Sequence, residues 1–132
     1  MSTCFAEVAE GVRAAIAAYA QALDDGRSDD VVATFCPDGS VDIPGLGAHR
    51  GHDALRSAFA AVAPKAPQRH LVLNTHVTRW SDEEAEATSD LAFAVKGGGA
   101  WAIALVGRYH DTLHRHDDGA WRFHRRRVVW AD

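Results

Sequence analysis

The sequence has few cysteines, no excess of positive charge and no long apolar run. Its two cysteines, Cys4 and Cys36, lie far apart and lack the spacing of a metal-binding motif. We therefore expect two reduced thiols in a cytoplasmic protein. The 14 basic and 18 acidic residues give a formal charge of −4, which offers no basis for nucleic-acid binding. No window approaches the roughly 18 apolar residues that a membrane-spanning helix needs, so no membrane association is expected.

Internal repeats, low-complexity tracts and linkers are also absent, so residues 1–132 are predicted to form a single domain. The first half of the chain shows helical periodicity. Apolar residues recur at steps of three and four over residues 5–24 and 52–63, and a shorter helix is expected at about 29–36.

The second half of the chain shows the features of strands. Strands are predicted at about 69–80, 84–96, 100–115 and 120–130, joined by connections as short as those of hairpins. Helices followed by an antiparallel meander indicate an α+β domain in which the helices gather on one face of the sheet.

The run AWAIALVGRYHDTL, residues 100–113, is apolar on both faces when it is read as a strand. Such a strand must be covered on both faces, and the helices cover only one of them. We therefore expect a second subunit on the other face, most simply in a twofold homodimer. The predicted interface face carries Trp101, Ile103, Leu105 and Tyr109. The predicted cavity face carries Ala102, Ala104, Val106, Arg108 and His110.

The run QRHLVLNTHV, residues 68–77, raises the same question of two faces. Alternation places His70 and Asn74 on the cavity side, and Leu71 and Leu73 on the subunit side, with Thr75 and Val77 continuing the latter face. Asp24 lies at the edge of the apolar stripe of the first helix. A carboxylate that is buried there needs a partner, and a histidine from the facing strand is a natural one.

The ordered set of motifs resembles the SnoaL-like branch of the nuclear-transport-factor-2-like superfamily over roughly residues 9–128. The motifs are YAQALD, FCPDGSVD, GHDAL, RHLVLNTHV and GRYHDTLHRHDDGAWRF. The resemblance implies a cone-shaped roll, with a curved antiparallel sheet wrapped around three helices and a central pocket. It also implies a homodimer or a homotrimer.

In the dehydratase-like members, an Asp near the end of the first helix pairs with a His on the first long strand, and Asp24 and His70 match these positions. The resemblance implies that Tyr19 assists as a hydrogen-bond donor. It therefore points to a cofactor-independent lyase or isomerase of the dehydratase or polyketide cyclase kind, which abstracts a proton from a small apolar oxygenated substrate. The expected substrate-binding residues are Asn74, His110, Arg108, Ala102, Ala104 and Phe59. His110 departs from the family pattern, because scytalone dehydratase has an Asn in its pocket at the matching position.

Other functions stay open at this level. The Asp24–His70 pair is also explained as a structural ion pair. The same cone suits a small-molecule-binding domain without catalysis, or an accessory subunit of an oxygenase. No cofactor is expected under any of these readings.

Two further questions concern the histidines and arginines near the C-terminus. His110, His114 and His116 share a strand face, but the last two approach a turn, so no metal site is predicted. Alternation does not determine whether Arg125 or Arg126 reaches the cavity, where an arginine would hold an anionic group.

Overall fold

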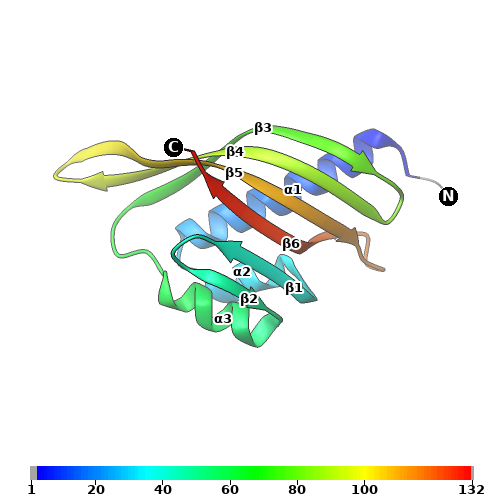
Figure 1. The fold of residues 1–132 in the computed structure, drawn as a ribbon, viewed down its shortest axis with the longest axis horizontal. Coiled ribbons are helices and arrows are strands. Elements are labelled where there is room, and N and C mark those ends of the chain that lie inside the picture. The colour runs from blue at the N-terminus through cyan, green and yellow to red at the C-terminus, as the bar shows by residue number, and fades with distance from the viewer. Residues whose placement is uncertain (1–2, 132) are drawn as a thin grey trace.

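The computed structural model describes residues 3–131 and shows three helices packed against one face of a curved six-stranded sheet (Figure 1). The elements are α1 (Phe5–Asp24), α2 (Ser28–Ala33), β1 (Phe35–Ile43), β2 (Gly47–Arg50), α3 (His52–Ala61), β3 (Gln68–Trp80), β4 (Glu84–Gly97), β5 (Ala100–Arg115) and β6 (Trp121–Trp130). The predicted α+β architecture is confirmed. The second helix is shorter than expected, because Phe35 and Cys36 belong to β1.

The strand order is β2-β1-β6-β5-β4-β3, so the predicted meander forms four of the six strands of the sheet. Its strands β3 to β6 pair antiparallel, whereas β1 joins β6 in parallel. The apolar stripe of α1 packs on the concave side and buries Val12, Ile16 and Tyr19 against the sheet. Of the helices that the structure describes, none is long and apolar enough to cross a membrane.

A β-bulge in β3 interrupts the alternation of side chains. Leu73 pairs with Asp90 and His76 pairs with Thr88, so β3 has one residue more than β4 between these pairs. Asn74 lies in this segment with a φ of 55°. A bulge bends its strand and moves the following side chains to the opposite face.

The bulge divides a face that strict alternation keeps together. Leu71 and Leu73 are exposed, as expected for the subunit side. Beyond the bulge, Val77 is buried and the Thr75 hydroxyl lies 3.1 Å from that of Ser89, which is itself buried. The expectation that Thr75 and Val77 lie on the same side as the two leucines was wrong for this reason.

A second bulge lies in β5 at Ala104, between the pairs Leu105–Phe93 and Ile103–Ala94. It separates the predicted interface residues. Tyr109 is only 1% exposed and belongs to the core, whereas Ile103 remains exposed. The expectation that Tyr109 contacts a second subunit is therefore wrong.

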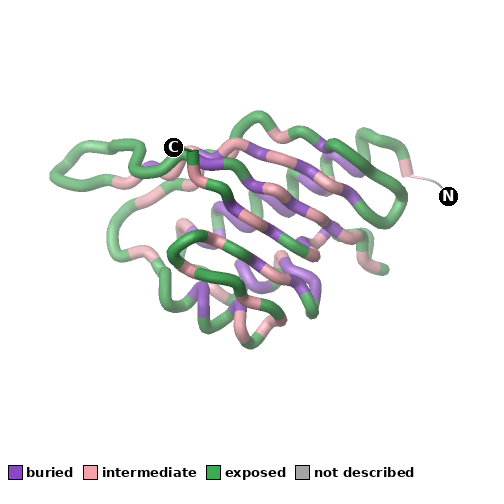
Figure 2. The backbone as a smooth tube through the Cα atoms, viewed as in Figure 1, coloured by how far each residue is buried: buried purple, intermediate pink, exposed green. Residues whose placement is uncertain are grey.

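The β4–β5 hairpin projects beyond the helices, as the yellow ribbon in Figure 1 and the green tube in Figure 2 show. Ala102 and Ala104 lie in this projecting part and are exposed. They do not line a cavity, contrary to expectation, because no helix covers the sheet at this point.

A third bulge, at His124 in β6, determines which of the two arginines points into the core. Neither Arg125 nor Arg126 is among the residues that line the cavity between the helices and the sheet. Phe123 pairs with Leu113 and Arg125 pairs with Thr112, so His124 is the additional residue. Regular alternation from the buried Phe123 would turn Arg125 inward. The bulge instead leaves Arg125 exposed and buries its neighbour Arg126 completely.

Arg126 forms a buried ion pair with Asp111 of β5. Its Nε atom lies 3.0 Å from Asp111 Oδ1, and its Nη2 atom lies 3.4 Å from Oδ2. The guanidinium also stacks over the rings of Tyr109, at 3.4 Å, and Tyr19, at 4.3 Å. Burial raises the pKa of Asp111 to about 6, against the opposing effect of Arg126. Removing one partner would leave an unpaired buried charge, which typically costs about 3–5 kcal/mol.

Candidate active site

A cavity of about 280 Å³ lies between the helices and the concave face of the sheet. Its wall is largely apolar and aromatic, and it includes Tyr19 of α1, Phe59 of α3 and Tyr109 of β5. His70 and Gln68, both from β3, are the polar side chains of the wall apart from the tyrosines and Trp130. An apolar hollow with a few convergent polar groups is the usual form of a small-molecule site.

A larger groove of about 740 Å³ runs between α1 and β3 along the sheet edge, and His70 borders it as well. The groove is open to solvent, and Arg13, Gln21 and Asn74 are among its lining residues. The smaller cavity is the better candidate site, because there the aromatic wall and the polar groups surround the same space.

The structure brings Asp24 and His70 together at the cavity wall. Asp24 is the last residue of α1, and its Oδ1 atom lies 2.6 Å from His70 Nδ1. The backbone N–H of His70 donates to Asp24 Oδ2 at 2.8 Å, and Gln68 Nε2 donates to Oδ1 at 3.2 Å. The side chain of Asp24 is only 5% exposed, and these three donors satisfy its need for hydrogen bonds.

These contacts define the state of both groups. Burial acts to raise the pKa of Asp24, but the hydrogen bonds from the His70 ring and backbone outweigh it, so the pKa lies below the ordinary 3.8. An ionised carboxylate only accepts hydrogen bonds, and therefore His70 Nδ1 carries a proton. In the neutral ring, Nε2 then holds the free lone pair.

Tyr19 packs at the centre of an aromatic cluster with Phe35, Phe59, Tyr109 and Phe123, at ring distances of 5.8 to 6.2 Å. Its hydroxyl is buried and has no hydrogen-bond partner among residues 3–131. Burial raises the pKa of this phenol, so it stays protonated and can only donate or accept as a neutral group. An unsatisfied buried hydroxyl costs about 1–3 kcal/mol, which a bound oxygen acceptor would recover.

Of the predicted substrate-binding residues, Phe59 lines the cavity with Tyr19 and His70. Asn74 and Arg108 instead meet at Asp90 on the outer face of the sheet. Arg108 Nε donates to Asp90 Oδ1 at 2.7 Å, and Asn74 Nδ2 donates to Oδ2 at 3.0 Å. Neither residue lines the cavity, because bulges in β3 and β5 reverse the alternation on which their placement depended.

His110 also lies away from the cavity. It borders a shallow depression on the outer face with Arg125 and Arg127. Partial burial, Arg127 and Arg108 together lower the pKa of His110. Ala102 and Ala104 lie on the projecting hairpin, so the expected substrate-binding set is reduced to Phe59.

Sequence reasoning missed two features of this region. The first is the hydrogen bond from Gln68 to Asp24. Gln68 precedes His70 by two residues, so alternation alone was sufficient to place both on one face of the strand. The Asp111–Arg126 pair beneath the tyrosines was missed as well. The signal in the sequence was Asp111, which lies between Tyr109 and Leu113 on the same face of a regular strand. A charged residue between two large apolar ones on a buried face needs a partner.

The chain belongs to the SnoaL-like domain family, whose sequence model matches residues 6–127. This confirms the family that the sequence resembles. A comparison with curated proteins gave no match.

Solved structures with the same fold include several proteins of unknown or provisional function. One is a variant of a Mycobacterium tuberculosis protein of unknown function, 25% identical, with a TM-score of 0.84 over 92% of this chain and 70% of that one. Another is the ActVI-ORFA protein of Streptomyces coelicolor, 24% identical, with a TM-score of 0.83 over 93% and 96%. A third is a Novosphingobium aromaticivorans protein provisionally named a scytalone dehydratase, 22% identical, with a TM-score of 0.81 over 93% and 83%.

The contacts of Asp24 predict how stability depends on pH. Because folding lowers the pKa of Asp24, its contribution is present above the ordinary pKa of 3.8 and is lost as the pH falls through the folded value. The Asp24→Asn variant should therefore lose more free energy of unfolding, relative to the wild type, at about pH 5 than at about pH 3. Urea unfolding at the two pH values measures this difference.

Asp25→Asn is the matched control, because Asp25 is exposed and, among the described residues, pairs only with the exposed Arg27. Its effect should change little over the same range. Equal pH dependence in the two variants would contradict the assigned hydrogen bonds of Asp24.

Proposed function

We propose that the protein is a cofactor-independent lyase or isomerase in which the Asp24–His70 pair abstracts a proton from a small, largely apolar, oxygenated substrate. The observation that carries the proposal is the 2.6 Å contact between Asp24 Oδ1 and His70 Nδ1 at the wall of the cavity. It leaves Nε2 as the basic nitrogen, and Nε2 makes no hydrogen bond within residues 3–131.

The proposed reaction begins when His70 Nε2 takes a proton from the carbon next to a substrate carbonyl. The resulting imidazolium is stabilised by the ionised Asp24, which also keeps the ring in one tautomer. The electron pair left on carbon forms a double bond as a β-hydroxyl leaves, and His70 returns its proton to that hydroxyl as water. Isomerisation and ring closure begin with the same proton transfer and differ only in where the electrons then move.

Tyr19 is the second proposed catalytic group. Its protonated hydroxyl would donate a hydrogen bond to the substrate oxygen on which negative charge develops. The support for this role is the buried hydroxyl without a partner in a residue that lines the cavity. The guanidinium of Arg126, paired with Asp111, lies 4.3 Å from the centre of the Tyr19 ring.

The substrate class follows from the lining of the cavity. Aromatic and aliphatic side chains form most of the wall, and the polar groups are few. A compact ring or short chain with a carbonyl and a hydroxyl fits this balance of surfaces. The solved relative named as a scytalone dehydratase is consistent with water loss, although at 22% identity that likeness concerns the fold.

Removing the base tests the proposed mechanism directly. His70→Ala should lower kcat by about 10²–10⁴-fold on a β-hydroxy ketone that the wild type dehydrates, since general base catalysis contributes this much. A panel of such ketones can be screened by the absorbance of the conjugated product. His76→Ala is the matched control, because His76 lies exposed on the same strand. Wild-type turnover by a folded His70→Ala variant would disprove the mechanism.

Tyr19→Phe separates a catalytic hydroxyl from a structural one. The substitution removes a buried hydroxyl that has no partner in residues 3–131, so the free energy of unfolding should stay equal or rise by about 1 kcal/mol. Turnover should nevertheless fall by about 10²-fold, as expected for the loss of a donor to a developing oxyanion. Urea unfolding and steady-state kinetics on one preparation measure both effects. A stable variant with unchanged kcat would assign the hydroxyl no role in catalysis.

We also propose that the protein is a homodimer formed through the outer face of the sheet. Six large apolar residues on β3, β5 and β6 are each at least 42% exposed there: Leu71, Leu73, Trp101, Ile103, Val106 and Val129. Leu71 and Val106 both pair with Ala92 of β4, which makes them neighbours across the sheet. The interface differs from the one expected from sequence, because Tyr109 is buried and Leu105 lines the cavity.

Ile103→Glu should convert the dimer to a monomer, because a dimer would bury the new charge without a partner. Ala63→Glu adds the same charge beyond α3, outside the proposed interface, and should leave the dimer intact. Light scattering at micromolar concentration reports the mass of each. A monomeric wild type would disprove this interface, as would a dimeric Ile103→Glu variant.

A further inference from the structure

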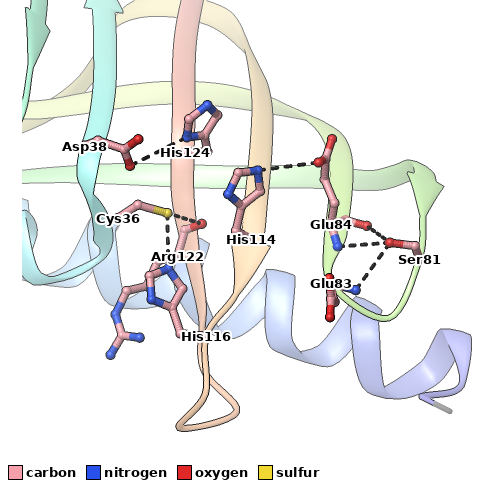
Figure 3. A network of polar contacts seen from close by, with 9 residues as sticks. All are labelled: Cys36, Asp38, Ser81, Glu83, Glu84, His114, His116, Arg122 and His124. Atoms are coloured by element: carbon pink, nitrogen blue, oxygen red, sulfur yellow. Dashed lines mark hydrogen bonds and ion pairs between the residues drawn. The ribbon is translucent and has the colours of Figure 1, made fainter.

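A group of histidines and one cysteine lies on the outer face of the sheet, opposite the cavity (Figure 3). Cys36 comes from β1, His114 from β5 and His124 from β6. One potential ligand atom from each lies within 4.8 Å of the others. These residues come from three adjacent strands, and the bulge at His124 contributes to their convergence.

From this arrangement we propose a binding site for a zinc-like divalent metal, with Cys36, His114 and His124 as ligands and His116 as the fourth. A thiolate with imidazoles is a donor set that Zn²⁺ prefers, in tetrahedral geometry. Zn–S bonds of about 2.3 Å and Zn–N bonds of about 2.0 Å place neighbouring ligand atoms roughly 3.3–3.6 Å apart. His116 Nε2 already lies 3.2 Å from Cys36 Sγ. The ligand atoms of Cys36, His114 and His124 lie within 4.8 Å of one another and would have to approach by about 1 Å, within the reach of side-chain rotation. His116 lies outside this group, so its ring would also have to turn toward His114 and His124.

The state of the rings supports a ligand at this point. Nδ1 of His124 is buried and has no hydrogen-bond partner among the described residues. It lies 3.9 Å from Asp38 Oδ1, too far for a hydrogen bond. The rings of His114 and His124 stack at 4.4 Å with an angle of 13°, so binding would rotate them out of this stack. A metal would satisfy the unpaired nitrogen, which solvent does not reach.

A carboxylate lies beside one of the ligand rings, as it does in known zinc centres. Glu84 Oε2 lies 3.5 Å from Nε2 of His114, which leaves Nδ1 of that ring for the metal. Asp38 Oδ1 lies 3.9 Å from Nδ1 of His124, the nitrogen that would bind the metal, so it is not an outer partner of that ring. The nearby Arg122 is neutralised by Asp118, at 2.8 Å. Metal binding releases the thiol proton of Cys36 to solvent, since the thiolate is the ligand.

This site is separate from the proposed catalytic pair. The metal would connect β1, β5, β6 and the hairpin between the last two strands, and its role would be to stabilise the sheet rather than to contact the substrate. From the sequence, His110, His114 and His116 were considered together and no metal site was predicted. His110 shares a strand with His114, but it does not belong to the cluster, whereas His124 and Cys36 do.

Cobalt binding tests the proposal without any substrate. Metal-free, reduced wild-type protein should bind one Co²⁺ per chain, with a thiolate-to-cobalt charge-transfer band and the intense visible bands of tetrahedral cobalt. Zn²⁺ should displace the cobalt and raise the Tm of the wild type, since a ligand that binds the folded state stabilises it. Absence of both the band and the Zn²⁺-dependent rise in Tm would overturn the proposal.

Variants then identify the ligands. Cys36→Ser should lose the charge-transfer band, whereas Cys4→Ser should keep it, because Cys4 is the other free cysteine and lies outside the cluster. His124→Ala should weaken Zn²⁺ binding by at least about tenfold, and Glu84→Gln by about 10–100-fold as the carboxylate partner of a ligand. A band that survives in Cys36→Ser would overturn the site. If a variant does not fold, the change in Tm of the wild-type protein on addition of Zn²⁺ still tests the proposal.

Discussion

A sheet that wraps around a helix has to bend, and in this protein the bending is concentrated at bulges. Each extra residue in β3, β5 or β6 turns the following part of the strand over. The consequences are chemical as well as geometric. The bulge at His124 sends Arg126 rather than Arg125 into the core. The bulge at Ala104 turns Leu105 toward the cavity. The faces that Asn74, Arg108 and Arg126 occupy depend on these bulges.

Asp24 joins the two layers of the domain. One buried carboxylate at the end of α1 accepts hydrogen bonds from the ring and backbone of His70 and from Gln68. The same contacts hold the helix against β3 and fix the tautomer of the histidine. Replacing Asp24 therefore affects both the stability of the fold and the orientation of His70. A loss of activity in an Asp24 variant is informative only when the folding of that variant is also measured.

The long periodic segments made the architecture predictable from sequence. The helix of twenty residues and the four strands of the meander carry strong patterns, and the Asp24–His70 contact follows from a carboxylate at a helix edge facing a strand. Placements that depended on alternation across a bulge could not be predicted. Asn74 and Arg108 were assigned to the cavity and lie outside it, because the extra residue in each strand leaves no mark in the hydrophobic pattern.

The cysteine–histidine cluster illustrates a different limit. Its members come from residues 36, 114 and 124, and β1 joins β6 through a parallel pairing that skips most of the chain. No short spacing in the sequence indicates that Cys36 lies close to His114 and His124. Motif searches rely on ligands that lie close together in sequence, so this kind of site becomes visible only when the order of the strands is known.

Within residues 3–131, β3 lies at one end of the sheet, with β4 on one side and no strand on the other. An exposed strand edge is a template on which further chains can add, and long regular edges promote aggregation. The bulge at Asn74 breaks the register of this edge near its middle, and Arg69 and Arg79 place charges on either side of the break. The irregularity in the strand that carries His70 therefore also protects the folded protein from assembling into extended sheets.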